Sequence, residues 1–327
     1  LSFFKFVQVF YRLGFCKTYV FKKNIIISIG NLSVGGSGKT PMVVFLSKLL
    51  SDLNMSHAIV SRGYKRKSKG EVVVSDGEKI VDDCFLAGDE PLMLASMLPG
   101  VPVIVGDKSR SCQKVSELKN YETIIIDDGF QTLKIEKDLN ILLLDLSRDK
   151  EDYRLLPLGR LREPLSAISR ADVVIFTKKN SSSNDIKAFL SSFIDPKKQL
   201  VLESSFLFSL LKYENNRFLK IRDLIDAPVL SFSGIENPRS FSEAVSGFFS
   251  NVSTNLVFKD HCDYGQLELK KISDLLLEKK IHAIVTTMKD FVKIKHLFNN
   301  IDFFVINVHC EILNKKPLID RLNLLQK

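Results

Sequence analysis

The most constraining stretch of the sequence is an apolar run followed directly by a glycine-rich loop. Residues 25–29 read Ile-Ile-Ile-Ser-Ile, which is of strand length, and the loop that follows ends in Gly-Lys-Thr at 38–40. Apolar residues then recur at helical spacing from Pro41 to Leu50, and proline is common in a first helical turn. This order of strand, loop and helix is the context that a P-loop requires.

Each residue type in such a loop has a task at a phosphate. The residues expected to turn their backbone N–H groups toward it are Gly35, Gly36, Ser37 and Gly38. Lys39 can reach the β- and γ-phosphates, and the Thr40 hydroxyl can bind Mg²⁺. The strict pattern has glycine where this chain has Ser33, although the glycines at 35–38 can supply the same turn. A glycine-rich turn with an incidental Lys-Thr is the alternative to this nucleoside triphosphate site.

A second motif has the form of a Walker B element. The apolar run 123–126 ends in Asp127-Asp128-Gly129. In a P-loop protein an aspartate at this place holds Mg²⁺, directly or through water. The alternative is an exposed turn that is rich in aspartate.

Apolar runs without alternation predict the fold. They occur at 58–60, 72–74, 101–105, 123–126 and 141–144. Such runs are typical of strands buried on both faces, so we expect an α/β fold, with a P-loop NTPase-type parallel sheet covered by helices.

The length of 327 residues favours two domains. We predict a P-loop kinase core at 24–150 and a second, smaller α/β domain at 151–310, joined near a Pro- and Gly-containing stretch at 146–165. A C-terminal helix is expected at 311–327, where it can pack back on the core domain.

Residues 1–23 are unusually rich in phenylalanine and lysine. They are too short and too charged for a spanning helix, and they predict an amphipathic helix lying on a membrane. A helix packed on the protein's own core is the alternative.

The net charge of +9 favours an acidic partner, which is a nucleic acid, an anionic membrane or a phosphorylated substrate.

Three further features have both a functional and a structural interpretation. The basic segment 61–67 can grip phosphate or be a solvated loop. The acids of Gly88-Asp89-Glu90-Pro91 can simply cap a helix. Among the histidines, His261 is the catalytic candidate, because it follows Asp260 just past a predicted strand, whereas the others lie in helix or strand patterns.

These motifs together resemble one family. The segments that carry the resemblance are 30–41, Ser61-Arg62-Gly63-Tyr64, 88–91, Asp127-Asp128-Gly129-Phe130-Gln131, Leu161-Arg162-Glu163-Pro164-Leu165 and Asp260-His261. In this combination and order they are similar to tetraacyldisaccharide 4'-kinase, the lipid A 4'-kinase or LpxK family. The resemblance covers nearly the whole chain, and it accounts for Ser33, since the loop of this family lacks the first Walker glycine.

The resemblance implies an activity and a location. The family transfers the γ-phosphate of ATP, with Mg²⁺, to the 4'-hydroxyl of an acylated glucosamine disaccharide 1-phosphate. It acts at the cytoplasmic face of the bacterial inner membrane. We therefore expect a lipid substrate, a peripheral or monotopic membrane protein that is monomeric, and no nucleic-acid partner.

The resemblance also implies residue roles. Lys39 and Thr40 are expected to contact the phosphates and Mg²⁺. Asp127 and Asp128 are expected to lie at the metal and the transferring group. Glu163 is expected to line the site near them. Asp107 corresponds to the catalytic aspartate of the family, and His261 to its partner in an Asp–His pair. The two lie in different halves of the chain, so the active site is expected where the domains face each other.

Two positions depart from the family pattern. Lys108 stands where an acidic residue often follows the catalytic aspartate, and Thr132 stands where histidine usually follows Asp-Asp-Gly-Phe-Gln.

A different class of protein remains open, namely a membrane-associated P-loop switch ATPase that acts on a protein partner. It would use the same Walker elements, but it would need no remote Asp–His pair.

Overall fold

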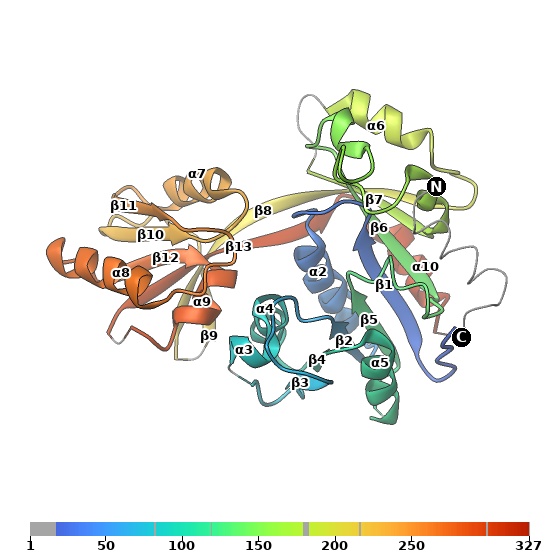
Figure 1. Ribbon diagram of the computed structural model, residues 1–327, viewed down its shortest axis with the longest axis horizontal. Helices are drawn as coiled ribbons and strands as arrows, with labels where there is room; N and C mark the ends of the chain where they lie inside the picture. The colour runs from blue at the N-terminus through green and yellow to red at the C-terminus, as the bar shows by residue number, and fades with distance from the viewer. Residues whose placement is uncertain are drawn as a thin grey trace. The chain divides into compact units, whose positions relative to one another are not determined.

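The computed structural model describes residues 18–81, 83–118, 120–178, 183–215, 217–298 and 300–326. The chain forms two compact units. The first comprises Leu1–Phe206 and Cys310–Lys327, and the second comprises Leu207–His309. The chain leaves the first unit along β8 (Leu200–Glu214) and returns along β13 (Asp302–Ile312). Each unit is an α/β structure with its own buried core (Figure 1).

The sheet of the first unit has the strand order β8-β7-β6-β1-β5-β2-β4-β3. Its strands besides β8 are β1 (Ile25–Asn31), β2 (His57–Ser61), β3 (Val72–Ser75), β4 (Val103–Val105), β5 (Thr123–Asp127), β6 (Leu139–Asp145) and β7 (Val173–Thr177). Neighbouring strands from β8 to β4 are parallel, and β3 is antiparallel to β4. The predicted, mostly parallel sheet is confirmed, and its central strands are buried on both faces.

Helices cover both faces of this sheet. The helices of the first unit are α2 (Lys39–Asp52), α3 (Cys84–Ala87), α4 (Asp89–Met97), α5 (Lys108–Glu117), α6 (Ser183–Ser191) and α10 (Lys316–Asn323), with 3₁₀ turns η1 (Lys150–Tyr153) and η2 (Leu165–Arg170). The crossover through α2 runs along the sheet in one direction and that through α5 in the other. Because parallel crossovers are right-handed, these two helices lie on opposite faces.

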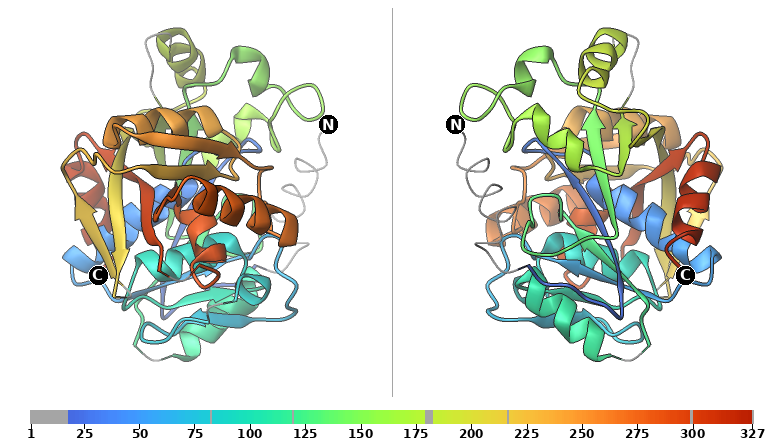
Figure 2. Two further views of the ribbon diagram at one scale, coloured as in Figure 1. Left: turned by 90° about the vertical axis from the view of Figure 1, so that its left-hand side faces the viewer. Right: turned by 90° about the vertical axis from the view of Figure 1, so that its right-hand side faces the viewer.

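The second unit repeats the α/β pattern, as expected, without a P-loop. Its strands follow the order β11-β10-β12-β13-β8, with β9 paired to β8. The elements are β9 (Arg217–Ile221), β10 (Val229–Ser233), α7 (Pro238–Phe248), β11 (Val252–Val257), α8 (Gln266–Glu278), β12 (Ala283–Thr287) and α9 (Met288–Ile294). Phe241 and Val245 of α7 pack into a core with Val285 and Phe304 of the sheet. Figure 2 gives two further views of these elements.

The boundary between the compact units differs from the expected connection near residue 150. β7 pairs in parallel with β6, and β8 with β7, so the first sheet continues as far as β8. The Pro- and Gly-containing stretch at 146–165 is therefore internal to the first unit. It has the composition of a linker, but its backbone is hydrogen-bonded to the P-loop, from Val34 N–H to the Arg160 carbonyl. The long strand β8 and its partner β9 were not predicted.

Most of the predicted N-terminal helix at 1–23 lies outside the described residues. Within 18–23 there is no helix, and Tyr19 forms an isolated parallel bridge with Ile135. No helix in the described part of the chain has the length and apolar character needed to cross a membrane.

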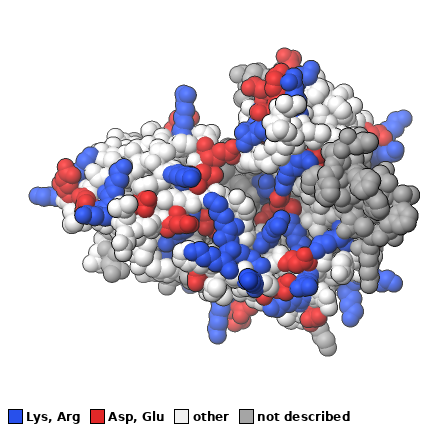
Figure 3. Space-filling model, in the orientation of Figure 1, with Lys and Arg blue, Asp and Glu red and all other residues white. Residues whose placement is uncertain are grey.

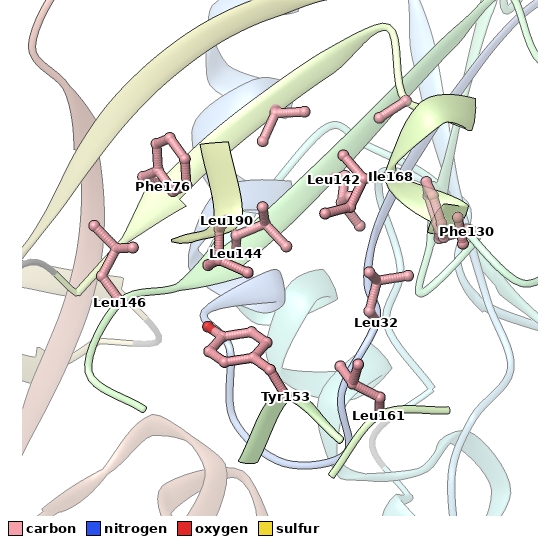
Figure 4. Close-up of a cluster of buried hydrophobic side chains, with 13 residues drawn as sticks. Leu32, Phe130, Leu142, Leu144, Leu146, Tyr153, Leu161, Ile168, Phe176 and Leu190 are labelled. Atoms are coloured by element: carbon pink, nitrogen blue, oxygen red, sulfur yellow. The ribbon is translucent and has the colours of Figure 1, made fainter. Parts of the chain in front are cut away.

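A cluster of buried apolar side chains lies at the base of the P-loop (Figure 4). Leu32 from the loop contributes to it together with Phe130, Leu142 and Leu161. Phe130 is fully buried and leaves no room beside Gly30, because a Cβ on Gly30 would lie 2.6 Å from the Phe130 Cβ and 2.8 Å from its backbone nitrogen. The end of β1 is thus packed directly against the segment that follows Asp127-Asp128.

This packing predicts that Gly30→Ala destabilises the protein. The added methyl group meets backbone as well as side chain, so the strand or the Phe130 segment has to move. Overpacking of this kind lowers the free energy of unfolding by about 1–3 kcal/mol. Urea denaturation is the measurement, with Gly247→Ala in α7 as the control, because a Cβ there meets nothing within 4 Å. Equal stability of the two variants would contradict the close packing at Gly30.

Candidate active site

The P-loop connects β1 to α2 in the first unit. Gly35 and Gly38 adopt the positive φ values that glycine permits, 96° and 84°. Gly38 is the N-cap of α2, no side chain caps the helix there, and its first turn holds no acidic residue. The helix N-terminus is therefore free of a competing carboxylate, which is what an anion-binding turn requires.

The loop is held in place by residues at the end of β7. The Lys178 ammonium donates to the Gly36 carbonyl and forms an ion pair of 2.8 Å with Asp145 at the end of β6. The Thr177 hydroxyl lies 3.4 Å from the Ser37 carbonyl oxygen. The Ser37 hydroxyl itself is buried without a hydrogen-bond partner among the described residues. A buried donor left unpaired, beside an uncapped helix, fits the phosphate group of a nucleotide.

The two aspartates of the Walker B-like motif differ in their surroundings. Asp127 ends β5, where it is buried, and it accepts a hydrogen bond of 2.9 Å from the Ser61 hydroxyl. Asp128 follows with a φ of 48° and is partly exposed. It accepts hydrogen bonds of 3.0 and 3.1 Å from the two terminal nitrogens of Arg162. Its Oδ1 is also 3.6 Å from the Lys39 ammonium, so P-loop and carboxylates form one cluster.

These surroundings shift the two pKa values in opposite directions. Burial raises the pKa of Asp127, and the adjacent Asp128 charge raises it further. Burial also acts to raise the pKa of Asp128, but the hydrogen bonds from Arg162 and the charge of Lys39 outweigh it and hold the pKa well below its ordinary value. Asp128 is thus the more firmly ionised carboxylate. Carboxylate oxygens close to Lys39 of the P-loop fit Mg²⁺, which prefers oxygen ligands.

Arg162 is the residue of this cluster to which the sequence alone assigned no role. Its backbone N–H donates to the Leu32 carbonyl over 2.7 Å, and the adjacent Leu161 forms a bridge with Ser33. Its guanidinium also donates to the Asn31 amide oxygen, which accepts a bond from Lys39 over 3.3 Å. The Leu-Arg-Glu-Pro motif therefore lines the base of the P-loop. Its presence in the motif was the available signal, but its partner Asp128 was not deducible.

Glu163, predicted to line the site, is fully buried and pairs with Arg170. Its carboxylate accepts hydrogen bonds of 2.7 and 3.0 Å from both terminal nitrogens of Arg170. The Arg170 guanidinium lies 4.5 Å from the centre of the Phe130 ring. This buried, forked ion pair ties the Leu-Arg-Glu-Pro segment to η2 beside the apolar cluster.

Asp107 stands at the end of β4 as the N-cap of α5. Its Oδ1 accepts from the N–H groups of Ser109 and Arg110, and its Oδ2 pairs with Lys134 at 2.5 Å. Burial acts to raise the pKa of Asp107, but the Lys134 hydrogen bond and the backbone N–H groups outweigh it and leave the pKa lowered. The side chain is 44% exposed, so an ionised carboxylate is open to solvent here.

The departure at Lys108 brings a further cation to the cluster. The Lys108 ammonium donates to the backbone carbonyl of Asp128. At the other departure, Thr132 takes part in the turn after Phe130, where its N–H donates to the Gly129 carbonyl over 2.9 Å.

His261 belongs to the second unit, and Asp107 to the first. It follows β11 with a φ of 59°, and its N–H donates to the Gly234 carbonyl over 3.2 Å. Gly234 in turn donates its own N–H to Asp290, which is fully buried, and the adjacent Lys289 pairs with Asp260 at 3.0 Å. The loop of the predicted Asp–His motif is thus anchored to the start of α9.

The fold and this cluster define a P-loop nucleotide-binding protein. β1 and β5 are neighbours with Ile29 opposite Asp127, so the glycine-rich loop and the paired carboxylates emerge side by side. Lys39 lies at the start of α2, and Arg162 and Lys108 bring two further cations to Asp128. This arrangement is suited to phosphoryl transfer.

The comparisons with known proteins agree on one family. The family model described as tetraacyldisaccharide-1-P 4'-kinase matches residues 2–326. A tetraacyldisaccharide 4'-kinase of Halothermothrix orenii is 34% identical over 321 residues, covering 91% of this chain and 83% of the relative. One from Desulfotalea psychrophila is 37% identical over 290 residues, covering 87% and 82%. A crystal structure of LpxK from Aquifex aeolicus in complex with ATP is 32% identical, with a TM-score of 0.78, covering 98% of this chain and 94% of that chain.

This chain belongs to the tetraacyldisaccharide-1-P 4'-kinase family, known as LpxK. The membership confirms the predicted resemblance, the α/β fold with a P-loop core, and kinase activity toward a tetraacyl disaccharide. The LpxK structure from Aquifex aeolicus is a complex with ATP, which is the nucleotide predicted here. The switch ATPase alternative is not supported.

The cluster geometry predicts that Arg162→Lys impairs nucleotide-dependent turnover. Lysine keeps the charge but cannot bond both Asp128 oxygens and Asn31 at once. Loss of charge-assisted hydrogen bonds worth about 1.5–3 kcal/mol each lowers turnover by roughly 10-fold or more. Steady-state kinetics provides the measurement, with Arg154→Lys, an exposed position of the same segment, as the matched control. Wild-type turnover in Arg162→Lys would show that Arg162 does not organise the site.

Proposed function

We propose that the P-loop cluster of the first unit is where this kinase transfers the γ-phosphate of ATP to the 4'-hydroxyl of a tetraacyl glucosamine disaccharide 1-phosphate. The observation that carries the proposal is the single cluster of Lys39, Asp127 and Asp128 at the ends of neighbouring strands. A phosphoryl group in transfer spreads negative charge over its oxygens, so positioned cations stabilise it.

Each member of the cluster has a task in this scheme. The N–H groups of residues 35–38 would bind the phosphates, and Lys39 would neutralise charge on the transferring group. Thr40, Asp128 and Asp127 would hold Mg²⁺, which would supply positive charge to offset that of the phosphates. Arg162 would keep Asp128 ionised and oriented. Glu163, whose carboxylate accepts a bond from Arg170, would line the site near these residues.

Asp107 is the proposed base. A sugar hydroxyl is a weak nucleophile, so a carboxylate must accept its proton as the phosphoryl group arrives. The lowered pKa of Asp107 keeps it in the deprotonated form that accepts a proton. The N–H groups of Ser109 and Arg110 engage Oδ1, whereas Oδ2 has Lys134 as its one described partner. Since each carboxylate oxygen has two lone pairs, Oδ2 can take a second donor.

His261 is the proposed partner of Asp107 in acid–base catalysis. Hydrogen-bonded to Asp107 during transfer, it would orient the carboxylate and share the proton that Asp107 receives. Backbone bonds through Gly234 and Asp290 hold the loop that carries His261.

The location and assembly of the enzyme are part of the proposal. The acylated acceptor lies in a membrane, and residues 1–23 have the composition of an interfacial anchor. Lysine and arginine side chains are prominent on the face seen in Figure 3, in keeping with anionic headgroups and an anionic substrate. We infer a monomer bound to the cytoplasmic face of the inner membrane, without a nucleic-acid partner.

The proposed reaction predicts that labelled phosphate moves from ATP to a tetraacylated disaccharide 1-phosphate. Label should appear in the lipid, and little should appear as free phosphate when the acceptor is omitted. Lys39→Ala should lower transfer by roughly 10²-fold or more, because it removes a stabiliser of transition-state charge. Lys48→Ala, on an exposed turn of the same helix, is the control. Near-normal transfer by folded Lys39→Ala, or ATP hydrolysis indifferent to the acceptor, would refute the assignment.

The proposed Asp107–His261 pair predicts non-additive losses. In a double-mutant cycle on turnover, Asp107→Ala and His261→Ala should each be slow, and the double variant about as slow as the worse single one. Residues that act as a unit behave in this way because removal of either disables the other. If the two losses multiply in the double variant, the residues act independently and the pair has to be abandoned.

A further inference from the structure

Lys108 directs its side chain into the P-loop cluster. It is the first residue of α5, directly after Asp107, and the side chain is partly buried. Its ammonium donates a hydrogen bond to the backbone carbonyl of Asp128, twenty positions further along the chain. This contact places a cation beside the residue that Arg162 and Lys39 also approach.

The charges around Lys108 come from several elements. Burial lowers the pKa of its ammonium, and the Asp128 and Asp127 carboxylates oppose that lowering. Arg162 and Arg62 are nearby cations that add to it, and Lys137 is a further cation that interacts with Lys108. A polyphosphate entering the P-loop brings negative charge to this cluster, and the Lys108 ammonium, held at the Asp128 carbonyl, attracts that charge. Nucleotide binding and the positive charge of Lys108 therefore favour each other.

The same charge has the opposite effect on a divalent cation. Mg²⁺ held by Asp127 and Asp128 would lie near the Lys108 ammonium, which bonds the backbone carbonyl of Asp128, and like charges repel. Mg²⁺ and Lys108 thus serve partly the same purpose, which is to offset the phosphate charge. The benefit of either one is greatest when the other is missing.

We infer that Lys108 belongs to the phosphate site as a resident cation, and that it lowers the dependence of nucleotide binding on Mg²⁺. The inference rests on the nucleotide site and not on the acceptor, so it is tested without a lipid substrate. It assigns a function to a position at which this chain departs from the family pattern.

A purely structural role for Lys108 has different consequences. Asp128 adopts a φ of 48°, and a hydrogen bond to its carbonyl stabilises that turn. If the bond to this carbonyl were all that Lys108 provides, its loss would weaken nucleotide binding equally with and without Mg²⁺. A side chain that keeps a donor without the charge would then replace it.

Two variants separate charge from hydrogen bonding. Lys108→Met removes both, whereas Lys108→Gln keeps an amide donor on a slightly shorter side chain and removes the charge alone. Lys108→Arg keeps the charge. Lys48→Met is the matched control, because it removes an exposed lysine of α2.

The experiment is titration calorimetry of the full chain with the non-hydrolysable analogue AMPPNP, at fixed pH and ionic strength, in EDTA and in excess Mg²⁺. Lys108→Met and Lys108→Gln should both raise Kd roughly 10-fold or more in EDTA and clearly less in Mg²⁺, in line with a lost charge contact. Lys108→Arg and Lys48→Met should stay within about threefold of the wild type.

Other outcomes overturn the inference. Equal losses in the two buffers, or wild-type affinity in Lys108→Gln, would leave Lys108 with a structural role only. Unchanged affinity in every variant would remove it from the phosphate site. Thermal unfolding of each variant shows whether it is folded, and because Lys108→Gln is the milder change, it decides the question if Lys108→Met does not fold.

Discussion

The site depends on how the charge of two consecutive aspartates is compensated. Asp127 and Asp128 follow a buried strand, and two adjacent carboxylates in such a place repel each other and lose hydration. Two hydrogen bonds from the Arg162 guanidinium and a nearby Lys39 ammonium compensate the negative charge of Asp128. The result is an unequal pair, with Asp128 firmly ionised and the pKa of buried Asp127 raised. In the proposed reaction this pair would hold the metal cation beside the phosphate.

The same interaction explains why the segment around residues 155–164 is built into the first unit. Its backbone bonds to Leu32 and Val34 position the Arg162 guanidinium between Asp128 and Asn31. Behind it, the buried pair of Glu163 and Arg170 holds the segment against the apolar cluster. Breaking a buried ion pair leaves an uncompensated charge, so this support is costly to lose. A stretch without regular secondary structure thereby carries the residue that bonds the Asp128 carboxylate.

Several features were predictable because they depend on local chain chemistry. A β-branched run, glycines with positive φ and a lysine at a helix start specify the P-loop wherever they occur. The strand that ends in Asp127 was predictable for the same reason. The partners of these residues were not. Arg162 lies 34 positions from Asp128, and Lys134 lies 27 from Asp107, and nothing in the local pattern links them.

The sequence by itself determined the fold class, the P-loop, the paired carboxylates and the family. These follow from hydrophobic periodicity and from short motifs whose residues act within one turn of chain. Only the tertiary structure decided that the sheet continues through β7 and β8. It also decided that the Glu163 carboxylate pairs with Arg170 and that the Lys108 ammonium bonds the Asp128 carbonyl. The physical reason is that charge pairing and packing act between surfaces that meet only after folding, at distances along the chain that no local pattern encodes.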